Sequence, residues 1–315
     1  MSIAEIKNCF KGRDFITLRD YTQEEINHLI ETAITLKTKL RQGVSDPYLK
    51  GKTLGMIFQK SSTRTRVSFE VGMYQLGGMA LFLSSNDLQI GRGEPVKDTA
   101  RVLSRYLDGI MIRTFSHNEV LALAGYADIP VINGLTDLLH PCQALADIMT
   151  IKEQKGKLAG LKMAYIGDGN NMAHSLMFAG AKMGMEVVVA SPVGYRPQAV
   201  IIDQSNEVAK ANGGSITITE DILEAAKGAD VLYTDVWASM GQEQEIKARA
   251  KAFVGYQINE ELLKKAASKA IVLHCLPAHR GEEITDEVME GPHSAIFDQA
   301  ENRLHAQKAI LALLM

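Results

Sequence analysis

The chain has 315 residues, of which 46% are hydrophobic and 23% charged, enough for two ordinary folded domains. A formal net charge of −3 excludes a broad basic surface, so nucleic acid is not expected as a partner. Three scattered cysteines exclude a disulfide framework or zinc cluster. With no secretory leader and no apolar run near ~18 residues, we expect a cytoplasmic protein that is neither secreted nor membrane-bound.

The first half of the chain alternates helices and strands. Thr22 and Glu25 form a capping-box pattern that predicts a helix running to about Leu40. Pro95, after a polar loop, suits the first turn of a further helix. The elements predicted after Leu40 are strands at 53–58, 79–83, 109–113 and 130–132, and helices at 67–76, 96–107, 119–126 and 141–154.

The second half resumes this alternation after a stretch rich in lysine and glycine at 152–160. The predicted elements are strands at 161–167, 186–190, 215–219, 231–236 and 270–274, and helices at 172–183, 222–227, 260–267 and 300–315. Such alternation predicts an α/β protein with two doubly wound parallel-sheet domains and an active-site cleft between them. We assign residues 1–150 to the first domain and 151–299 to the second, with the helix at 300–315 packing back on the first.

Residues 58–66 are the most informative segment, because two arginines and a run of hydroxyls follow a buried strand and precede a helix. Free backbone N–H groups at a helix start favour an anion, and guanidinium groups match phosphate oxygens. The segment therefore predicts a phosphate site, although hydroxyls that cap a helix beside solvated arginines would give the same pattern.

Polar residues also follow other strands, where ligands bind in parallel sheets. They are Arg113, the segment 140–143, the segment 167–171, the segment 235–241 and the segment 274–277. Each alone has an ordinary structural explanation, such as an ion pair, a helix cap or a small buried cysteine. Five of them at one topological edge favour a binding site.

The loop Gly167-Asp168-Gly169 resembles the start of a dinucleotide-binding fingerprint. Met172 replaces its third glycine, however, and the next strand runs into Ser191-Pro192, where an acidic residue would be needed for the ribose. A nicotinamide-dependent dehydrogenase is therefore disfavoured, and Asn170 and Asn171 suit an amino acid better than a pyrophosphate.

Together, STRTR at 62–66, HPCQ at 140–143 and HCLP at 274–277 resemble motifs of the aspartate/ornithine carbamoyltransferase family. DVWASMG at 235–241 resembles its ornithine-specific members, and the segments 98–105 and 300–303 also fit. The resemblance implies a transferase of arginine biosynthesis that moves the carbamoyl group of carbamoyl phosphate to the δ-amine of L-ornithine, yielding L-citrulline and phosphate. It implies no cofactor and no metal.

The resemblance also implies roles for individual residues. The catalytic residues would be Arg64, Arg113, His140, Asp235 and Cys275. Carbamoyl phosphate would be bound by Ser62, Thr63, Arg64, Thr65, Gln89, Arg113, His140, Gln143, Cys275, Leu276 and Arg303. Ornithine would be bound by Asn171, Asp235, Ser239 and Met240. Asp235 and Cys275 would also orient the attacking amine and favour its neutral form.

Gln89 matches a residue that family members lend to a neighbouring subunit, which implies a homotrimer or a multiple of trimers. Two alternatives remain open at this stage. A carbamoyltransferase for another amine such as putrescine should alter Ser239-Met240-Gly241, which this chain retains. A non-catalytic phosphate- or amino-acid-binding protein would not need Arg113, His140 and Cys275 together.

Overall fold

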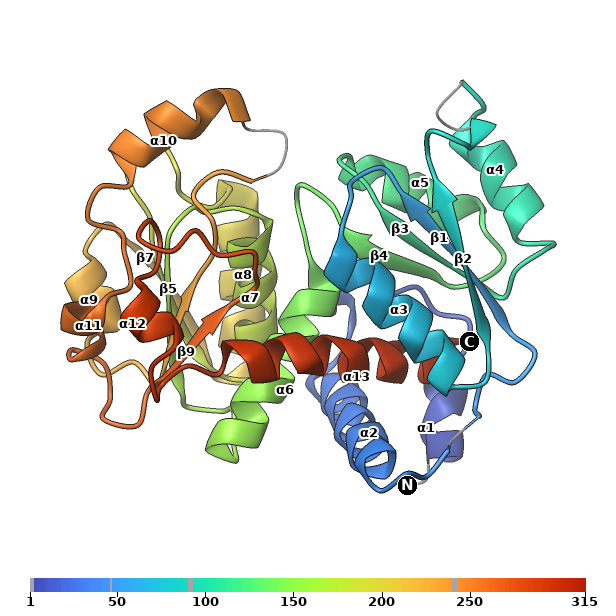
Figure 1. The fold of residues 1–315 in the computed structure, drawn as a ribbon, viewed down its shortest axis with the longest axis horizontal. Coiled ribbons are helices and arrows are strands. Elements are labelled where there is room, and N and C mark those ends of the chain that lie inside the picture. The colour runs from blue at the N-terminus through green and yellow to red at the C-terminus, as the bar shows by residue number, and fades with distance from the viewer. Residues whose placement is uncertain (1–2, 46, 90–92, 240–242) are drawn as a thin grey trace. The chain divides into compact units, whose positions relative to one another are not determined.

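A computed structural model describes residues 3–45, 47–89, 93–239 and 243–315 (Figure 1). Its internal contacts divide the chain into two compact units. Unit 1 contains Met1–Met149 and Glu301–Met315, and unit 2 contains Thr150–Ala300. The boundaries fall within helix α6 (Pro141–Lys155) and near the start of helix α13 (Ile296–Leu314).

In unit 1, the described residues form a four-stranded parallel sheet in the order β2-β1-β3-β4. Thr53 pairs with Met79 and Leu54 with Gly109. Helix α3 lies against β2, and α4 packs on α5 (Figure 1). The elements are α1 (Ile3–Phe10), η1 (Leu18–Asp20), α2 (Gln23–Arg41), β1 (Thr53–Phe58), α3 (Thr63–Gln75), β2 (Met79–Ser84), α4 (Val96–Leu103), β3 (Gly109–Arg113), α5 (His117–Tyr126) and β4 (Val131–Leu135).

Unit 2 holds a five-stranded parallel sheet within the described ranges, in the order β7-β6-β5-β8-β9. Its core includes Ala164, Ile166, Leu232 and Val272, all fully buried. The elements are β5 (Lys162–Ile166), α7 (Asn171–Lys182), β6 (Glu186–Ala190), α8 (Ala199–Asn212), β7 (Ser215–Thr219), α9 (Ile222–Ala226), β8 (Val231–Thr234), η3 (Glu243–Glu245), α10 (Ile246–Ala252), α11 (Glu260–Leu263), β9 (Ile271–His274) and α12 (Asp286–Met289).

The predicted pair of parallel α/β sheets is confirmed, and so is the capping box at Thr22 and Glu25. Helix α3 begins four residues before the predicted start at Val67. Ser62 is its N-cap and accepts a hydrogen bond from the Thr65 N–H, so the hydroxyl run forms the first helical turn.

Four helices, α1, α8, α10 and α12, were not predicted. In α8 only a narrow stripe, Ile201, Ser205 and Ala209, is buried, and it includes a polar residue. This pattern is too weak for hydrophobic periodicity to mark a helix. Gly213 ends that helix in the left-handed conformation with φ 73°, which was a usable stop signal.

The last helix, α13, packs on α3 within unit 1. A side-chain carbon added at Gly72 would lie 3.3 Å from Cγ of Lys308, so glycine permits this close approach. Lys308 donates a 2.9 Å hydrogen bond to Gln75, and the Gly12 N–H donates to the Leu314 carbonyl at 2.9 Å. No helix among the described residues is long and apolar enough to cross a membrane.

Candidate functional site

Both sheets bring the predicted residues to their topological switch points. In unit 1 the order in which parallel strands are added reverses between the neighbouring strands β1 and β3, and in unit 2 it reverses between β5 and β8. The carboxyl ends of such a strand pair leave a crevice in which ligands bind. Ser62 follows β1 and Arg113 ends β3, whereas Asn171 follows β5 and Asp235 follows β8.

The unit 1 cluster is built around the first turn of α3. The Ser62 and Thr65 hydroxyl oxygens lie 3.0 Å apart. Arg303 on α13 donates to Thr65 Oγ1 at 3.1 Å and to Gln143 Oε1 on α6 at 2.6 Å. Thr65, Gln143 and Arg303 are all at least 97% buried. One guanidinium thus connects three helices beside a helix N-terminus, where backbone N–H groups favour an anion.

His140, at the start of α6, lies within the positive field of this cluster. Burial, and then the guanidinium groups of Arg303, Arg113 and Arg64, hold the pKa of His140 well below its usual value. The imidazole is therefore neutral at pH 7 and can donate one N–H without adding charge. Three guanidinium groups around a neutral donor suit a phosphate that carries a carbonyl group.

The other side chains of this segment differ in exposure. Thr63 is exposed, and Ser62 and Arg64 are half-buried. Cys142 is fully buried and donates to the Asn133 carbonyl at 3.3 Å, and burial raises its pKa to about 12. Cys142 is therefore a packing residue with an unreactive thiol.

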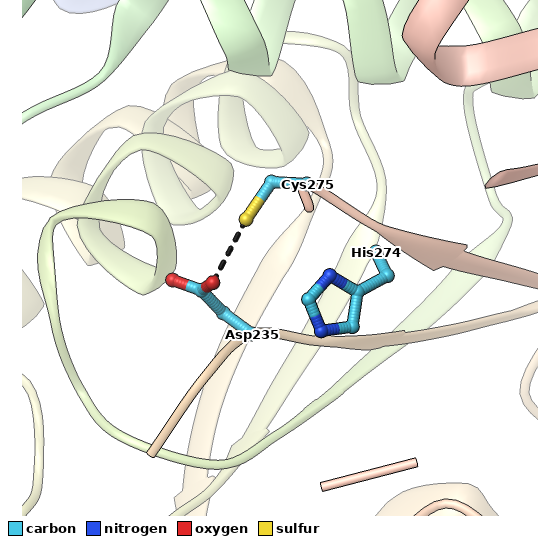
Figure 2. A group of neighbouring side chains, drawn as sticks. All are labelled: Asp235, His274 and Cys275. Atoms are coloured by element: carbon cyan, nitrogen blue, oxygen red, sulfur yellow. Dashed lines mark hydrogen bonds between the residues drawn. The ribbon is translucent and has the colours of Figure 1, made fainter. Parts of the chain in front are cut away.

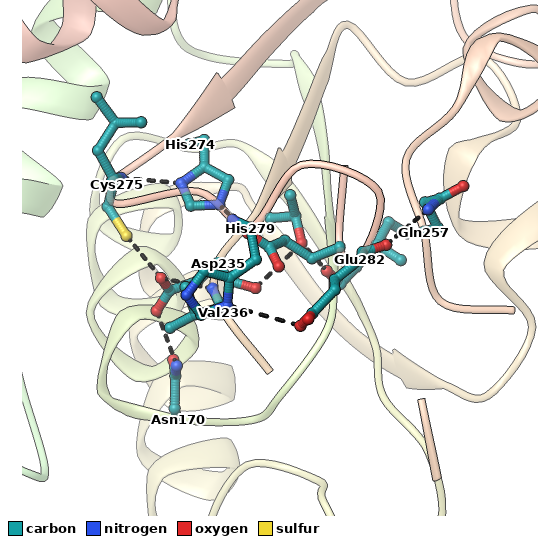
Figure 3. A network of polar contacts seen from close by, with 12 residues as sticks. Asn170, Asp235, Val236, Gln257, His274, Cys275, His279 and Glu282 are labelled. Atoms are coloured by element: carbon teal, nitrogen blue, oxygen red, sulfur yellow. Dashed lines mark hydrogen bonds and ion pairs between the residues drawn. The ribbon is translucent and has the colours of Figure 1, made fainter. Parts of the chain in front are cut away.

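The unit 2 cluster centres on Asp235, which is 6% exposed. Its carboxylate accepts hydrogen bonds from the Cys275 thiol at 2.9 Å, from Asn170 Nδ2 at 2.9 Å and from the Val236 N–H at 2.8 Å (Figures 2 and 3). Asn170 also caps α7 by accepting from the Met172 and Ala173 N–H groups. These bonds hold a carboxylate and a thiol together at the end of two strands.

His274 positions the segment that carries Cys275. The Leu276 N–H donates to His274 Nδ1 at 2.8 Å, so the ring proton is on Nε2, which lies 3.0 Å from Glu283 Oε1 (Figure 3). Leu276 has a left-handed backbone with φ 59°, uncommon for a residue other than glycine, and precedes a cis bond to Pro277. The left-handed backbone of Leu276 and its hydrogen bond to His274 orient the carbonyl groups of this segment.

Asp235, His274 and Cys275 offer ligand atoms within 4.8 Å of one another. Both ring nitrogens of His274 are nevertheless engaged, one by the Leu276 N–H and one by Glu283, so the ring has no lone pair for a metal. This trio therefore does not provide the three ligands of a stable zinc site.

The glycine loop after β5 serves packing. A side-chain carbon at Gly169 would lie 2.1 Å from the Pro197 backbone nitrogen, and the Gly169 N–H donates to the Tyr195 carbonyl at 2.8 Å. The segment at 195–197 thus packs directly against Gly169, so the close approach of this segment explains the glycine without a bound ligand.

Both halves of the chain match known protein families. Residues 13–153 match "Aspartate/ornithine carbamoyltransferase, carbamoyl-P binding domain", and residues 159–314 match "Aspartate/ornithine carbamoyltransferase, Asp/Orn binding domain". The chain belongs to the aspartate/ornithine carbamoyltransferase family. The family resemblance inferred from the motifs is thereby confirmed.

Full-length relatives agree with this family assignment. The chain is 62% identical to an ornithine carbamoyltransferase of Oceanobacillus iheyensis, over 97% of this chain and 95% of that relative. The solved ornithine carbamoyltransferase of Pyrococcus furiosus matches with a TM-score of 0.94 at 57% identity, over 97% of both chains. The anabolic ornithine carbamoyltransferase of Campylobacter jejuni matches with a TM-score of 0.89 at 45% identity, over 95% of this chain and 97% of that one.

Within this carbamoyltransferase fold, most predicted site residues gather in the two clusters. Asn171 begins α7 beside Asn170, and Ser239 is half-buried in the loop after β8. Gln89 is exposed, and no described contact joins its side chain to either cluster. Met240 and its neighbour Gly241 lie outside the described residues.

Sequence reasoning selected neither Asp147 nor Arg249, and it included Asp168 only as part of the segment at 167–171. Asp147, fully buried, accepts from Gln143 Nε2 at 2.7 Å and so orients that amide. Asp168 and Arg249 form a buried ion pair in unit 2 with an Nη1 to Oδ2 distance of 2.8 Å. Burial raises the pKa of Asp168 to about 6, and Arg249 opposes the shift. Asp147 could have been found from its i+4 spacing to Gln143 on a helix, whereas the pair is 81 residues apart in sequence.

Proposed function

We propose that the protein transfers the carbamoyl group of carbamoyl phosphate to the δ-amine of L-ornithine, forming L-citrulline and phosphate. The observation that carries this proposal is the environment of His140: a neutral imidazole among Arg64, Arg113 and Arg303, beside the capped first turn of α3. That combination fits an acyl phosphate better than phosphate alone, because it adds an uncharged donor for the carbonyl oxygen to the anion site.

In this proposal unit 1 binds carbamoyl phosphate. Ser62, Thr63, Arg64 and Thr65 bind the phosphate oxygens through hydroxyls, backbone N–H groups and a guanidinium. Attack on the carbonyl carbon moves negative charge to the carbonyl oxygen and then to the departing phosphate. Donors already oriented toward these atoms lower the barrier, because they need no rearrangement as the charge develops. Arg113 bridges the phosphate and the carbonyl oxygen.

The carbamoyl end has its own contacts in this proposal. The neutral His140 N–H polarises the carbonyl group. Gln143, Arg303 and the backbone carbonyls at Cys275 and Leu276 recognise the carbamoyl amide. Gln143 Oε1 already accepts from Arg303, and its second lone pair can accept from the carbamoyl amide, while the Gln143 amide nitrogen donates to Asp147.

Unit 2 binds ornithine in this proposal. Asn171, Ser239 and Met240 bind its α-amino and carboxylate groups, with Asp235 as the counter-charge to an amino group. The thiol of Cys275 points at Asp235 and helps to orient the attacking δ-amine (Figure 2). A free alkylamine has a pKa near ~10.4, so the site must favour the neutral amine before attack. Holding the two substrates at attack distance supplies much of the remaining rate.

We infer a homotrimer, or a multiple of trimers, in which Gln89 completes the phosphate site of a neighbouring subunit. The edge strand β2 supports an interface on unit 1, because Met79 and Phe82 are 56% and 39% exposed there. Exposed apolar side chains on an edge strand are commonly covered by another chain. We further propose a cytoplasmic location, because Cys275 is a free thiol and the role given to it needs the reduced form.

The decisive experiment measures carbamoyl transfer from carbamoyl phosphate to L-ornithine, detected as citrulline, and in parallel to putrescine, detected as carbamoylputrescine. The proposal requires turnover with ornithine and at most weak turnover with putrescine, which lacks the α-carboxylate. Preference for putrescine would overturn the choice of substrate, and no carbamoyl transfer to either amine would overturn the activity. Light scattering of the purified protein tests the trimer, because a monomer at assay concentration would contradict it.

A further inference from the structure

We propose that Arg249 and Asp168 form a positioning pair for ornithine, by tying together the two strand-end loops that carry its binding residues. The proposal rests on the proposed function. Neither residue contacts a reacting atom in it: Arg249 acts through the Trp237 backbone carbonyl, and Asp168 acts through Arg249.

Arg249 on α10 donates hydrogen bonds to three different residues. Its Nη1 donates to Asp168 Oδ2 at 2.8 Å and to the Trp237 carbonyl at 2.9 Å, and its Nε donates to Glu245 Oε2 at 2.9 Å. Asp168 belongs to the loop after β5, and Trp237 belongs to the loop after β8. One guanidinium therefore joins the loop that leads to Asn171 with the loop that leads to Ser239.

The pair is shielded from water. The Arg249 side chain is 8% exposed and the Asp168 side chain 9%, whereas Glu245 is 56% exposed. The Arg249 guanidinium lies 4.9 Å from the ring centroid of Tyr195. An ion pair that is shielded in this way has a higher local interaction energy than a surface pair, and losing one partner leaves an uncompensated charge.

Two hydrogen bonds connect the chain around Asp235 to other elements. On one side Asn170 donates to its carboxylate at 2.9 Å, and on the other Arg249 binds the Trp237 carbonyl two residues further along. The Asn170 bond holds Asp235 itself but does not reach the described loop residues 236–239 that follow it. The pair supplies that second constraint, so it should affect the fit of ornithine and leave the carbamoyl phosphate site in unit 1 unchanged.

The experiment compares steady-state kinetics of Arg249→Lys, Asp168→Asn and the double variant with those of the unmodified chain. Lysine retains the charge but cannot reach all three acceptors with a planar fork. Each single variant should raise the KM for ornithine about tenfold, the effect of losing one charge-assisted hydrogen bond. The KM for carbamoyl phosphate should stay within about twofold of its value in the unmodified chain. The ornithine KM of the double variant should be no higher than that of the more impaired single variant, because the two residues act as one unit.

Glu245→Gln is the matched control, because it changes only the exposed partner of the same guanidinium. It should leave both KM values within about twofold of those of the unmodified chain. Thermal melting verifies that each variant is folded. Unchanged ornithine KM values in folded single variants, equal increases in both KM values, or independent effects that multiply in the double variant would overturn the positioning pair. An unmodified chain that forms no citrulline would instead overturn the proposed function.

Discussion

Asp235→Asn is the sharpest test of the proposed ornithine site. Asparagine keeps the shape of the side chain but replaces one acceptor oxygen with a donor, in a position where the carboxylate now accepts from Cys275, Asn170 and the Val236 N–H. At least one of these bonds is lost, and so is the counter-charge to an ornithine amino group. Losing a buried charged partner costs roughly 2–4 kcal/mol, which corresponds to about a 30- to 700-fold lower kcat/KM for ornithine.

The assay measures citrulline formation first with ornithine varied at saturating carbamoyl phosphate, and then with carbamoyl phosphate varied at saturating ornithine. The KM for carbamoyl phosphate should change by less than about threefold, because its proposed ligands are mainly in unit 1. Asp230→Asn is the matched control: Asp230 precedes the same strand β8 and accepts from the Lys162 N–H at 2.9 Å, so its loss affects stability without touching the site. A larger effect on carbamoyl phosphate than on ornithine, or equal losses in both variants, would refute the reasoning.

Three further predictions test other parts of the molecule. Arg64→Ala should lower turnover by more than about a hundredfold and weaken carbamoyl phosphate binding without unfolding the chain, because it removes the proposed charge-assisted phosphate contact. Near-normal saturation by carbamoyl phosphate would show that this turn is only structural. Gln89→Ala subunits reassembled with Arg64→Ala subunits should regain activity, since some mixed interfaces contain both native residues, and activity no higher than the sum of the separate variants would rule out a shared site. Burial lowers the pKa of His305 to about 4, although Glu301 opposes the shift. Because the unfolded chain binds that proton near pH ~6.5, the unfolding free energy should fall by up to about 3 kcal/mol as the pH drops from about 6.5 to about 4. Urea unfolding of His305→Gln should show a smaller decrease, and an identical pH dependence in both proteins would contradict this assignment.

Local patterns in the sequence were sufficient for the sheet architecture. Short apolar strands alternating with helices can bury both faces only in parallel sheets, so both sheets could be predicted without knowledge of any contact. The segment at 62–66, with its proposed phosphate site, was recognisable for the same reason, because its hydroxyls, arginines and helix start are consecutive. Weakly amphipathic helices such as α8 were missed, since their stability comes from tertiary packing and leaves little periodic signal.

The sequence by itself determined which residue types follow each strand, and hence the chemistry available at both switch points. Only the tertiary structure decided which of them meet. Arg303 contacts Thr65 from 238 residues away, and Arg249 contacts Asp168 from 81 residues away, on helices with no strand-end position to mark them. Spacing along the chain carries no information about such pairs, because their separation depends on how whole helices pack. The low pKa of His140 is likewise a consequence of burial and then of three nearby guanidinium groups, and neither the burial nor their proximity exists before the chain is folded.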